Sequence, residues 1–132
     1  DSEGNLIKDF TPEATGHVDI ADSTWDAVHQ GMRAVITDGS VSKIFKDLEV
    51  EIAGKTGTAQ ESRTRGNHAF FISYGPYTNP EICVIVNIPY GYSSSNAAMV
   101  AKNVYRFYYG YTDLESILGS GALEVSNVKV GD

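Results

Sequence analysis

An ammonium group and two hydroxyl side chains alternate along one short stretch, residues 53–60 (Ala-Gly-Lys-Thr-Gly-Thr-Ala-Gln). In an extended chain, Lys55 and Gly57 share one face while Thr56 and Thr58 share the other. Threonine hydroxyls and an ammonium are natural partners for a carboxylate, because charge-assisted hydrogen bonds are the strong ones. Glycine in a strand often marks close approach of a ligand or another backbone. The stretch is therefore typical of a strand that receives an acidic ligand along its length.

The same letters also match the end of a phosphate-binding loop, G-x-x-x-x-G-K-[ST]. That motif needs a glycine five residues before Gly54, where this chain has Glu49. It also needs a helix that opens at the lysine, and a glycine followed by a polar run makes poor helix sequence. We therefore favour the strand interpretation over nucleotide binding.

The composition limits the classes of protein to consider. A chain of 132 residues is one domain or part of one. A net charge of -7 argues against a nucleic-acid partner, whose footprint is basic. Lys55, Arg63 and Arg65 make the central stretch positive, which suits a small anionic ligand or simply a solvated surface. The only cysteine, Cys83, lies in an apolar run and is predicted to be a buried small hydrophobic residue. Without an initial methionine, signal peptide or transmembrane run, the chain suggests an excised or cleaved piece.

The residues before the central stretch predict a helix over 23–38. Ser23 is the candidate N-cap, with Asp26 completing a capping box, and Gly39 supplies the stop. Gly31 inside this helix costs about 1 kcal/mol relative to alanine, which favours close packing with another element, the alternative being a tolerated surface glycine. The predicted apolar stripe consists of Trp25, Val28, Met32, Val35 and Ile36.

The residues after it predict an antiparallel arrangement. We expect strands over 50–61, 68–75 and 82–88, with a loop over 63–67 and a Pro- and Asn-containing turn over 76–80. The last strand is apolar on both of its faces, which indicates that it is covered on both sides.

A second helix is predicted over 96–109, begun by Asn96 and ended by Gly110. Residues 112–132 are acidic and are expected to form a tail or a loosely held extension, in which Val125, Val128 and Val130 could form a short strand. The predicted stripe of the second helix consists of Ala97, Val100, Ala101, Val104 and Tyr108.

The triplet Lys55-Thr56-Gly57, here called the KTG triplet, is also one of three signatures of penicillin-binding proteins and class A β-lactamases, the others being S-x-x-K and S-x-N. In order and spacing, the chain resembles the C-terminal part of a penicillin-binding protein transpeptidase domain, most closely the class B branch. The resemblance covers roughly residues 1–110. Besides residues 53–60, the segments that carry it are Trp25-Asp26-Ala27-Val28, Gly31-Met32-Arg33, His68-Ala69-Phe70-Phe71, Tyr74-Gly75-Pro76 and Asn79-Pro80-Glu81-Ile82.

This resemblance implies an α+β fold, in which an antiparallel sheet is flanked by helices, as a part of the DD-peptidase/β-lactamase-like serine transpeptidase fold. We expect residues 1–111 to be the C-terminal portion of the transpeptidase domain and 112–132 to be an acidic C-terminal tail. In the family the sheet has five antiparallel strands, two of which come from sequence before this chain. The strand over 82–88 would then be an unpaired edge, and the fragment is expected to form a homo-oligomer through it.

Two strings match the other signatures but fail as chemistry. Ser40-Val41-Ser42-Lys43 matches S-x-x-K, yet Ser40 follows a helix-stopping glycine, whereas the family needs serine and lysine one turn apart on a helix. Ser94-Ser95-Asn96 matches S-x-N, yet it follows the KTG triplet where the family has it before. The nucleophile is therefore expected outside this span. His17, His29 and His68 lack metal-ligand spacing, and the resemblance makes His68 a structural or site-flanking residue.

By resemblance, the residues of the central stretch take distinct roles. Lys55 lies beside the serine of S-x-N, supplies positive potential and assists proton transfer. Thr56 and Thr58 bind the terminal carboxylate of a substrate or of a β-lactam, and the backbone N–H of Thr58 is an oxyanion-hole donor. Gly57 leaves room for ligand against the strand, and Gln60 continues the wall of the site.

The resemblance implies a parent D,D-transpeptidase of peptidoglycan synthesis that acts through a serine acyl-enzyme and binds penicillin. Its partners would be a peptidoglycan stem peptide ending in D-Ala-D-Ala and β-lactam antibiotics, with no metal or organic cofactor. The parent would be anchored at the outer face of the bacterial cytoplasmic membrane by a segment upstream of this chain. The alternatives are a non-catalytic binding or structural module of the same fold, or a β-lactamase-related hydrolase.

Overall fold

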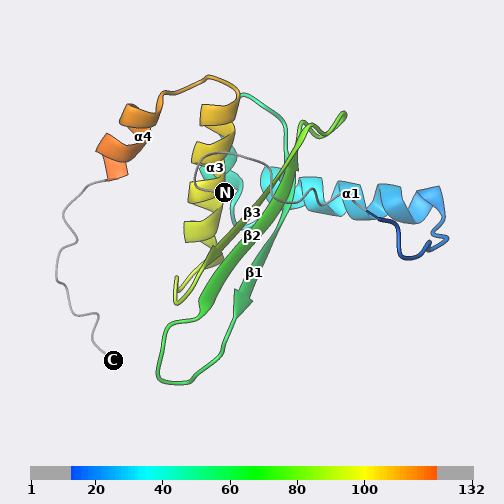
Figure 1. The fold of residues 1–132 in the computed structure, drawn as a ribbon, viewed down its shortest axis with the longest axis horizontal. Helices are drawn as coiled ribbons and strands as arrows, with labels where there is room; N and C mark the ends of the chain where they lie inside the picture. The colour runs from blue at the N-terminus through cyan, green and yellow to red at the C-terminus, as the bar shows by residue number, and fades with distance from the viewer. Residues whose placement is uncertain (1–12, 122–132) are drawn as a thin grey trace.

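The computed structural model describes residues 13–121, in which three strands form one antiparallel sheet of order β1-β2-β3 (Figure 1). This arrangement confirms the predicted α+β class, and β2 and β3 have the predicted bounds. In chain order the elements are α1 (Asp22–Thr37), α2 (Ser42–Phe45), β1 (Ala53–Ala59), β2 (His68–Gly75), β3 (Ile82–Ile88), α3 (Ser94–Tyr108) and α4 (Leu114–Gly121).

Helix α3 covers one face of the sheet. Its buried residues are three alanines and Tyr105, because small side chains let the helix approach the strands closely. Two predicted stripe residues, Ala97 and Ala101, are buried, but Val100, Val104 and Tyr108 were assigned wrongly and are exposed on the outer side. The core also contains Ile36, Val41, Phe45, Ile52, Ala69, Phe71, Val84 and Ala98.

The first residue of α3 also differs from the prediction. Ser93, not Asn96, is the N-cap, and its hydroxyl accepts a hydrogen bond from the Ser95 N–H at 3.3 Å. The Asn96 amide instead donates to the Gly91 carbonyl at 2.8 Å. At the other end, Gly110 ends the helix as predicted, with a φ of +71° that suits glycine.

Among the residues that the structure describes, the opposite face of the sheet is open except at Tyr74, whose ring contacts that of His29 in α1 at 5.7 Å between centroids. Ile72 is 44% exposed and Ile85 is 70% exposed, and both lie on this face with Cys83. The prediction that Cys83 is buried is therefore wrong, because its side chain points to the uncovered face. The prediction that β3 is covered on both sides likewise holds for one side only in residues 13–121.

Helix α1 extends away from the sheet, and only its C-terminal end reaches the core (Figure 1). Ile36 is buried, whereas Trp25 and Val28 near the other end of the predicted stripe are about half exposed. The predicted capping box is wrong, because the helix begins at Asp22 after Ala21 and has no side-chain cap.

The predictions for the glycine within α1 and for the glycine after it have different outcomes. A Cβ at Gly39 would lie 2.5 Å from the Val35 carbonyl oxygen, so the glycine stop is confirmed by sterics. Gly31 has nothing within 4 Å of a built Cβ, so the favoured explanation by close packing is wrong within the described residues.

The segment expected to form a tail or a loosely held extension begins with a helix, because α4 occupies residues 114–121. Asp113 caps this helix by accepting the Ser116 N–H at 2.7 Å and the Ser116 hydroxyl at 3.0 Å. These hydrogen bonds hold the pKa of the Asp113 carboxyl below its usual value. The short strand predicted around Val125 to Val130 lies outside the described residues. Within residues 13–121, no helix combines the length and the apolar character that crossing a membrane requires.

Candidate active site

Among the residues that the structure describes, the KTG triplet lies on β1, an edge strand with β2 on one side and a free edge on the other. In the register, Lys55 pairs with Ile72 and Thr56 pairs with Phe71. Successive residues of an antiparallel strand direct their backbone N–H and C=O groups alternately toward and away from the partner strand. The backbone N–H and C=O groups of Thr56 and Thr58 therefore point toward the same side of β1.

The side chains of the triplet flank this free edge from both faces of the sheet. Lys55 is exposed on the open face, and its ammonium donates to the Thr56 carbonyl at 2.8 Å. On the opposite face Thr56 is half-buried and Thr58 is exposed. Gln60 is exposed just beyond the end of β1. A ligand lying along the edge would thus meet an ammonium from one face and hydroxyls from the other.

Two glycines of β1 have separate structural reasons. A Cβ at Gly54 would lie 2.8 Å from Phe71 Cζ and 2.9 Å from the Ile72 carbonyl oxygen, so close cross-strand packing requires glycine there. A Cβ at Gly57 would lie 3.2 Å from Phe70 Cβ, which is tight but adjustable. Gly57 also lines a hollow of about 190 Å³, together with Lys55, Phe70, Ile72 and Ile85.

The N-terminal end of β1 is fixed by Arg33 of α1. One guanidinium nitrogen donates to the Ile52 carbonyl at 2.8 Å, and the other binds the Glu51 carboxylate at 2.8 Å. The sequence singled out Arg33 only as part of a matching segment. In the structure it joins α1 to the residues immediately before the strand.

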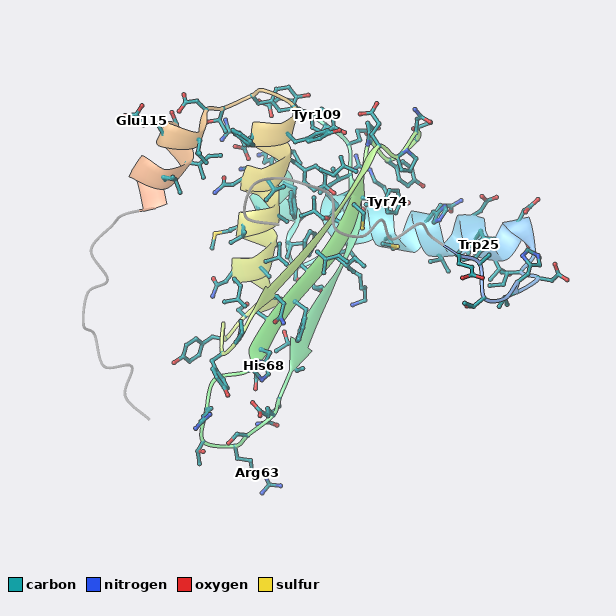
Figure 2. The ribbon with its side chains drawn as sticks, viewed as in Figure 1. Trp25, Arg63, His68, Tyr74, Tyr109 and Glu115 are labelled. Atoms are coloured by element: carbon teal, nitrogen blue, oxygen red, sulfur yellow. The ribbon has the colours of Figure 1, made fainter. Side chains whose placement is uncertain are left out.

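The C-terminal end of β1 meets a polar network that the sequence analysis did not predict. His68 Nε2 lies 3.0 Å from Glu61 Oε2, and the Tyr90 hydroxyl donates to the same oxygen at 3.1 Å. These two contacts hold the pKa of the Glu61 carboxyl below its usual value. His68 was expected to be structural or site-flanking, and Figure 2 shows it at the base of the loop after β1, with Arg63 at the far end of that loop. Arg65, on the same loop, donates to the Tyr90 hydroxyl at 2.9 Å.

The two strings dismissed from the sequence do not form a site in the structure either. Ser40 lies in the turn between α1 and α2, whereas Lys43 lies within α2. The Ser94-Ser95-Asn96 string forms the start of α3, as described above. In residues 13–121, no three His, Cys, Asp or Glu residues gather in a way that could hold a metal ion.

Comparison with known proteins decides the family. The model of the penicillin binding protein transpeptidase domain matches residues 3–106. This chain belongs to that family. Within the penicillin-binding proteins, it is 35% identical to the peptidoglycan D,D-transpeptidase MrdA of Haemophilus influenzae, over 65% of this chain and 16% of that protein. It is 29% identical to penicillin-binding protein 2A of Bacillus subtilis, over 70% of this chain and 14% of that protein.

Solved penicillin-binding protein structures share the fold. PBP2 of Pseudomonas aeruginosa, in complex with WCK 5153, is 32% identical with a TM-score of 0.65, over 76% of this chain and 23% of that one. Penicillin-binding protein 2B of Streptococcus pneumoniae is 27% identical with a TM-score of 0.65, over 84% of this chain and 19% of that one. The chain therefore spans about one sixth of the curated relatives and about one fifth of these structures.

Proposed function

We propose that this chain is the C-terminal part of a peptidoglycan D,D-transpeptidase and supplies the KTG wall of its active site. The observation that carries the proposal is the placement of Lys55, Thr56 and Thr58 around the free edge of β1, in a member of the penicillin-binding protein family. Two of the curated relatives are named D,D-transpeptidases, which supports the same reaction here.

The proposed reaction proceeds in two acyl transfers. A serine outside this span attacks a peptide that ends in D-Ala-D-Ala, and D-alanine leaves. An amine of a second peptide then takes the acyl group and cross-links the two chains. A β-lactam would acylate the same serine, so penicillin binding follows from the same chemistry. The residues described here offer hydrogen bonds and charge, and the reaction requires no metal or organic cofactor.

Each residue of the wall has a proposed role. Thr56 and Thr58 bind the terminal carboxylate of the substrate, while Gly57 and Gln60 shape the surface along which the peptide lies, in the way an extended peptide adds to a sheet edge. The Lys55 ammonium adds positive potential at the reacting centre. The Thr58 N–H donates to the oxyanion, and loss of one such donor typically costs about 100- to 1000-fold in rate.

The proposal extends to location and assembly. The whole protein would be anchored in the bacterial cytoplasmic membrane and act at its outer face, where peptidoglycan lies. Its partners would be stem peptides and β-lactams. The isolated chain would associate with itself through the β3 edge or the open face of the sheet, because both are apolar and uncovered in residues 13–121.

Two other functions use the same fold, a non-catalytic binding module and a β-lactamase-related hydrolase. The sequence upstream of Asp1 in the parent gene separates the first from the enzyme. An S-x-x-K followed by an S-x-N there supports the transpeptidase, and the absence of both supports the binding module. The hydrolase differs in outcome, because it would release the acyl group to water and regenerate free protein rapidly.

The test compares two lysines in the whole protein that carries this chain. Lys55→Ala should lower the second-order rate of acylation by a fluorescent penicillin far more than Lys43→Ala, because Lys55 belongs to the KTG triplet on β1 whereas Lys43 lies on α2. Equal rates for the two variants would refute the role of Lys55. The chain of 132 residues alone should give no covalent band on a denaturing gel, and a band that disappears in Ser40→Ala would show that Ser40 is a nucleophile after all.

A further inference from the structure

The residues after the KTG triplet form a closed network with two other parts of the chain. Glu61 follows β1, His68 begins β2, and Tyr90 lies in the turn between β3 and α3. The Tyr90 backbone N–H also donates to His68 Nδ1 at 3.3 Å, and the two rings lie 4.8 Å apart between centroids. We call these three residues the Glu61 clamp.

The hydrogen bonds of the clamp determine which of its groups are donors and which are acceptors. Because His68 Nδ1 accepts the Tyr90 N–H, the neutral ring carries its proton on Nε2 and donates it to Glu61. The Tyr90 hydroxyl donates to the same carboxylate oxygen, so two donors converge on Oε2. Arg65 supports the tyrosine by donating to its hydroxyl, with the guanidinium carbon 5.4 Å from the ring centroid.

The turn that presents Tyr90 is held in an unfavourable backbone conformation. Tyr90 has a φ of +54° and Tyr92 has a φ of +63°, although neither is glycine. Two hydrogen bonds secure the turn: the Tyr92 backbone N–H donates to the Asn67 carbonyl at 2.9 Å, and the Asn96 side-chain amide donates to the Gly91 carbonyl at 2.8 Å. Strained residues of this kind persist only where the surroundings determine them, and they cluster at functional sites.

The clamp lies directly beside the proposed site residues at the end of β1. The last pair of the β1–β2 register is Ala59 with His68, so the clamp begins where the ladder ends. Thr58 is one residue before that pair, and Gln60 is one residue after it. Because β1 has a partner strand on one side only within residues 13–121, its C-terminal end depends on such contacts for a fixed geometry. A misplacement of about 1 Å in a catalytic group can cost about 100-fold in rate.

We propose that the Glu61 clamp is a positioning device that holds Thr58 and Gln60 in the geometry needed for acylation. The inference rests on the proposed function. The hydrogen bonds of Glu61, His68 and Tyr90 join these residues to one another and not to Lys55, Thr56 or Thr58, so they would act through the backbone of β1. Arg65 strengthens the clamp through Tyr90.

The test uses the whole protein that carries this chain, with a fluorescent penicillin as the probe. Stopped-flow measurements separate the dissociation constant of the non-covalent complex from the first-order acylation rate constant. We expect Glu61→Ala to lower the rate constant at least tenfold, while the dissociation constant changes less than twofold. Glu61→Gln should restore most of the rate, because an amide oxygen at the Oε2 position still accepts both hydrogen bonds.

Matched tyrosine variants serve as the second measurement. Tyr90→Phe keeps the ring against His68 but removes the hydroxyl, and we expect a rate loss of several-fold. Tyr92→Phe removes a hydroxyl that has no hydrogen-bond partner among residues 13–121, and the rate should not change. Lys55→Ala is measured beside them as the reference for the proposed function.

The outcomes distinguish the two claims. If the wild type is acylated and Lys55→Ala is slow, but Glu61→Ala keeps the wild-type rate constant, the clamp is refuted while the proposed function stands. Losses that simply follow the melting temperature, with no rescue in Glu61→Gln, also refute it, because they indicate general stability. If the wild type is not acylated at all, the proposed function fails and the positioning role fails with it.

Discussion

The Tyr105 hydroxyl donates a hydrogen bond to Ser73 Oγ at 3.0 Å, in the buried layer between α3 and β2. Both residues are fully buried, and Ser73 Oγ in turn donates to the Val84 carbonyl of β3 at 3.4 Å. This polar chain crosses from the helix to two strands inside an otherwise apolar core. Because buried polar groups are costly unless paired, it fixes how α3 sits on the sheet that carries the KTG triplet.

Removing either partner of this pair should have unequal effects. Tyr105→Phe should lower the free energy of unfolding by about 1 kcal/mol, since Ser73 still donates to Val84. Ser73→Ala leaves the tyrosine hydroxyl buried without its acceptor and should cost about 1–3 kcal/mol. Urea unfolding of the chain, followed by circular dichroism, gives both values. A larger loss in Tyr105→Phe than in Ser73→Ala would contradict this account.

The same tyrosine predicts a loss of stability at high pH. Burial raises the pKa of Tyr105 from 10.0 to about 12. The folded state therefore keeps its proton where the unfolded state has lost it, so the stabilisation is complete below pH 10 and disappears as the pH rises to 12. The total is on the order of 2–3 kcal/mol, at 1.36 kcal/mol per pKa unit. Tyr105→Phe is the control, and unfolding free energies at pH 9 and pH 11.5 should differ less in it than in the wild type.

The two glycines on either side of Lys55 should respond differently to alanine. Gly54→Ala places a methyl group 2.8 Å from Phe71 Cζ and 2.9 Å from a backbone oxygen, so we expect a loss of about 1–3 kcal/mol from overpacking. Gly57→Ala meets only Phe70 Cβ at 3.2 Å and should cost less than 1 kcal/mol. Urea midpoints of the two variants, measured side by side, test the order. Equal losses would show that the cross-strand contact at Gly54 relaxes freely.

Local patterns were enough to predict the three strands, whereas the site residues proposed on β1 stay a prediction. Alternating side chains and turn residues gave the bounds of β2 and β3, and the chemistry of Lys55, Thr56 and Thr58 is adjacent in sequence. The predicted N-cap of α3 was wrong because Ser93, Ser94, Ser95 and Asn96 can all cap a helix. Only the backbone geometry selects Ser93. The face of α3 was misjudged because valines are more apolar than alanines, yet small residues fit against the sheet.

The Glu61 clamp could not be found from local patterns. Glu61 and Tyr90 are 29 positions apart, and each looks like an ordinary surface residue in the sequence. Glu61 follows β1 and Tyr90 follows β3, and only the antiparallel pairing of both strands with β2 puts their C-terminal ends at the same end of the sheet. The one local signal was Pro89-Tyr90-Gly91-Tyr92, a turn rich in proline and glycine that connects a strand to a helix.

Helix α4 should depend on the ionised side chain of Asp113. Its carboxylate accepts two hydrogen bonds from Ser116, which hold the Asp113 pKa below 3.8. A lowered pKa means that the contribution is complete above pH 3.8 and is lost as the pH falls through the folded-state value. Asp113→Ala should speed hydrogen exchange of the amides over 114–121 at neutral pH, while Asp113→Asn should keep most of the protection. Unchanged exchange in Asp113→Ala would show that the cap is dispensable.

The isolated chain should self-associate through the sheet. In the described part of the chain β3 is an edge strand, and on the open face Ile85 is 70% exposed beside Ile72. An unpaired apolar edge is a template for pairing with another chain. A few hundred Å² of apolar surface, at about 25 cal/mol per Å², contributes several kcal/mol and so favours a dimer at ordinary concentrations. Light scattering at micromolar concentration should therefore give at least twice the monomer mass.

Two lysine variants test which surface is responsible. Ile85→Lys should shift the mass toward the monomer, whereas Leu118→Lys, at a similarly exposed position on α4, should not. A well-folded wild-type monomer under these conditions would overturn the prediction, and equal shifts in both variants would place the contact elsewhere than on the open face.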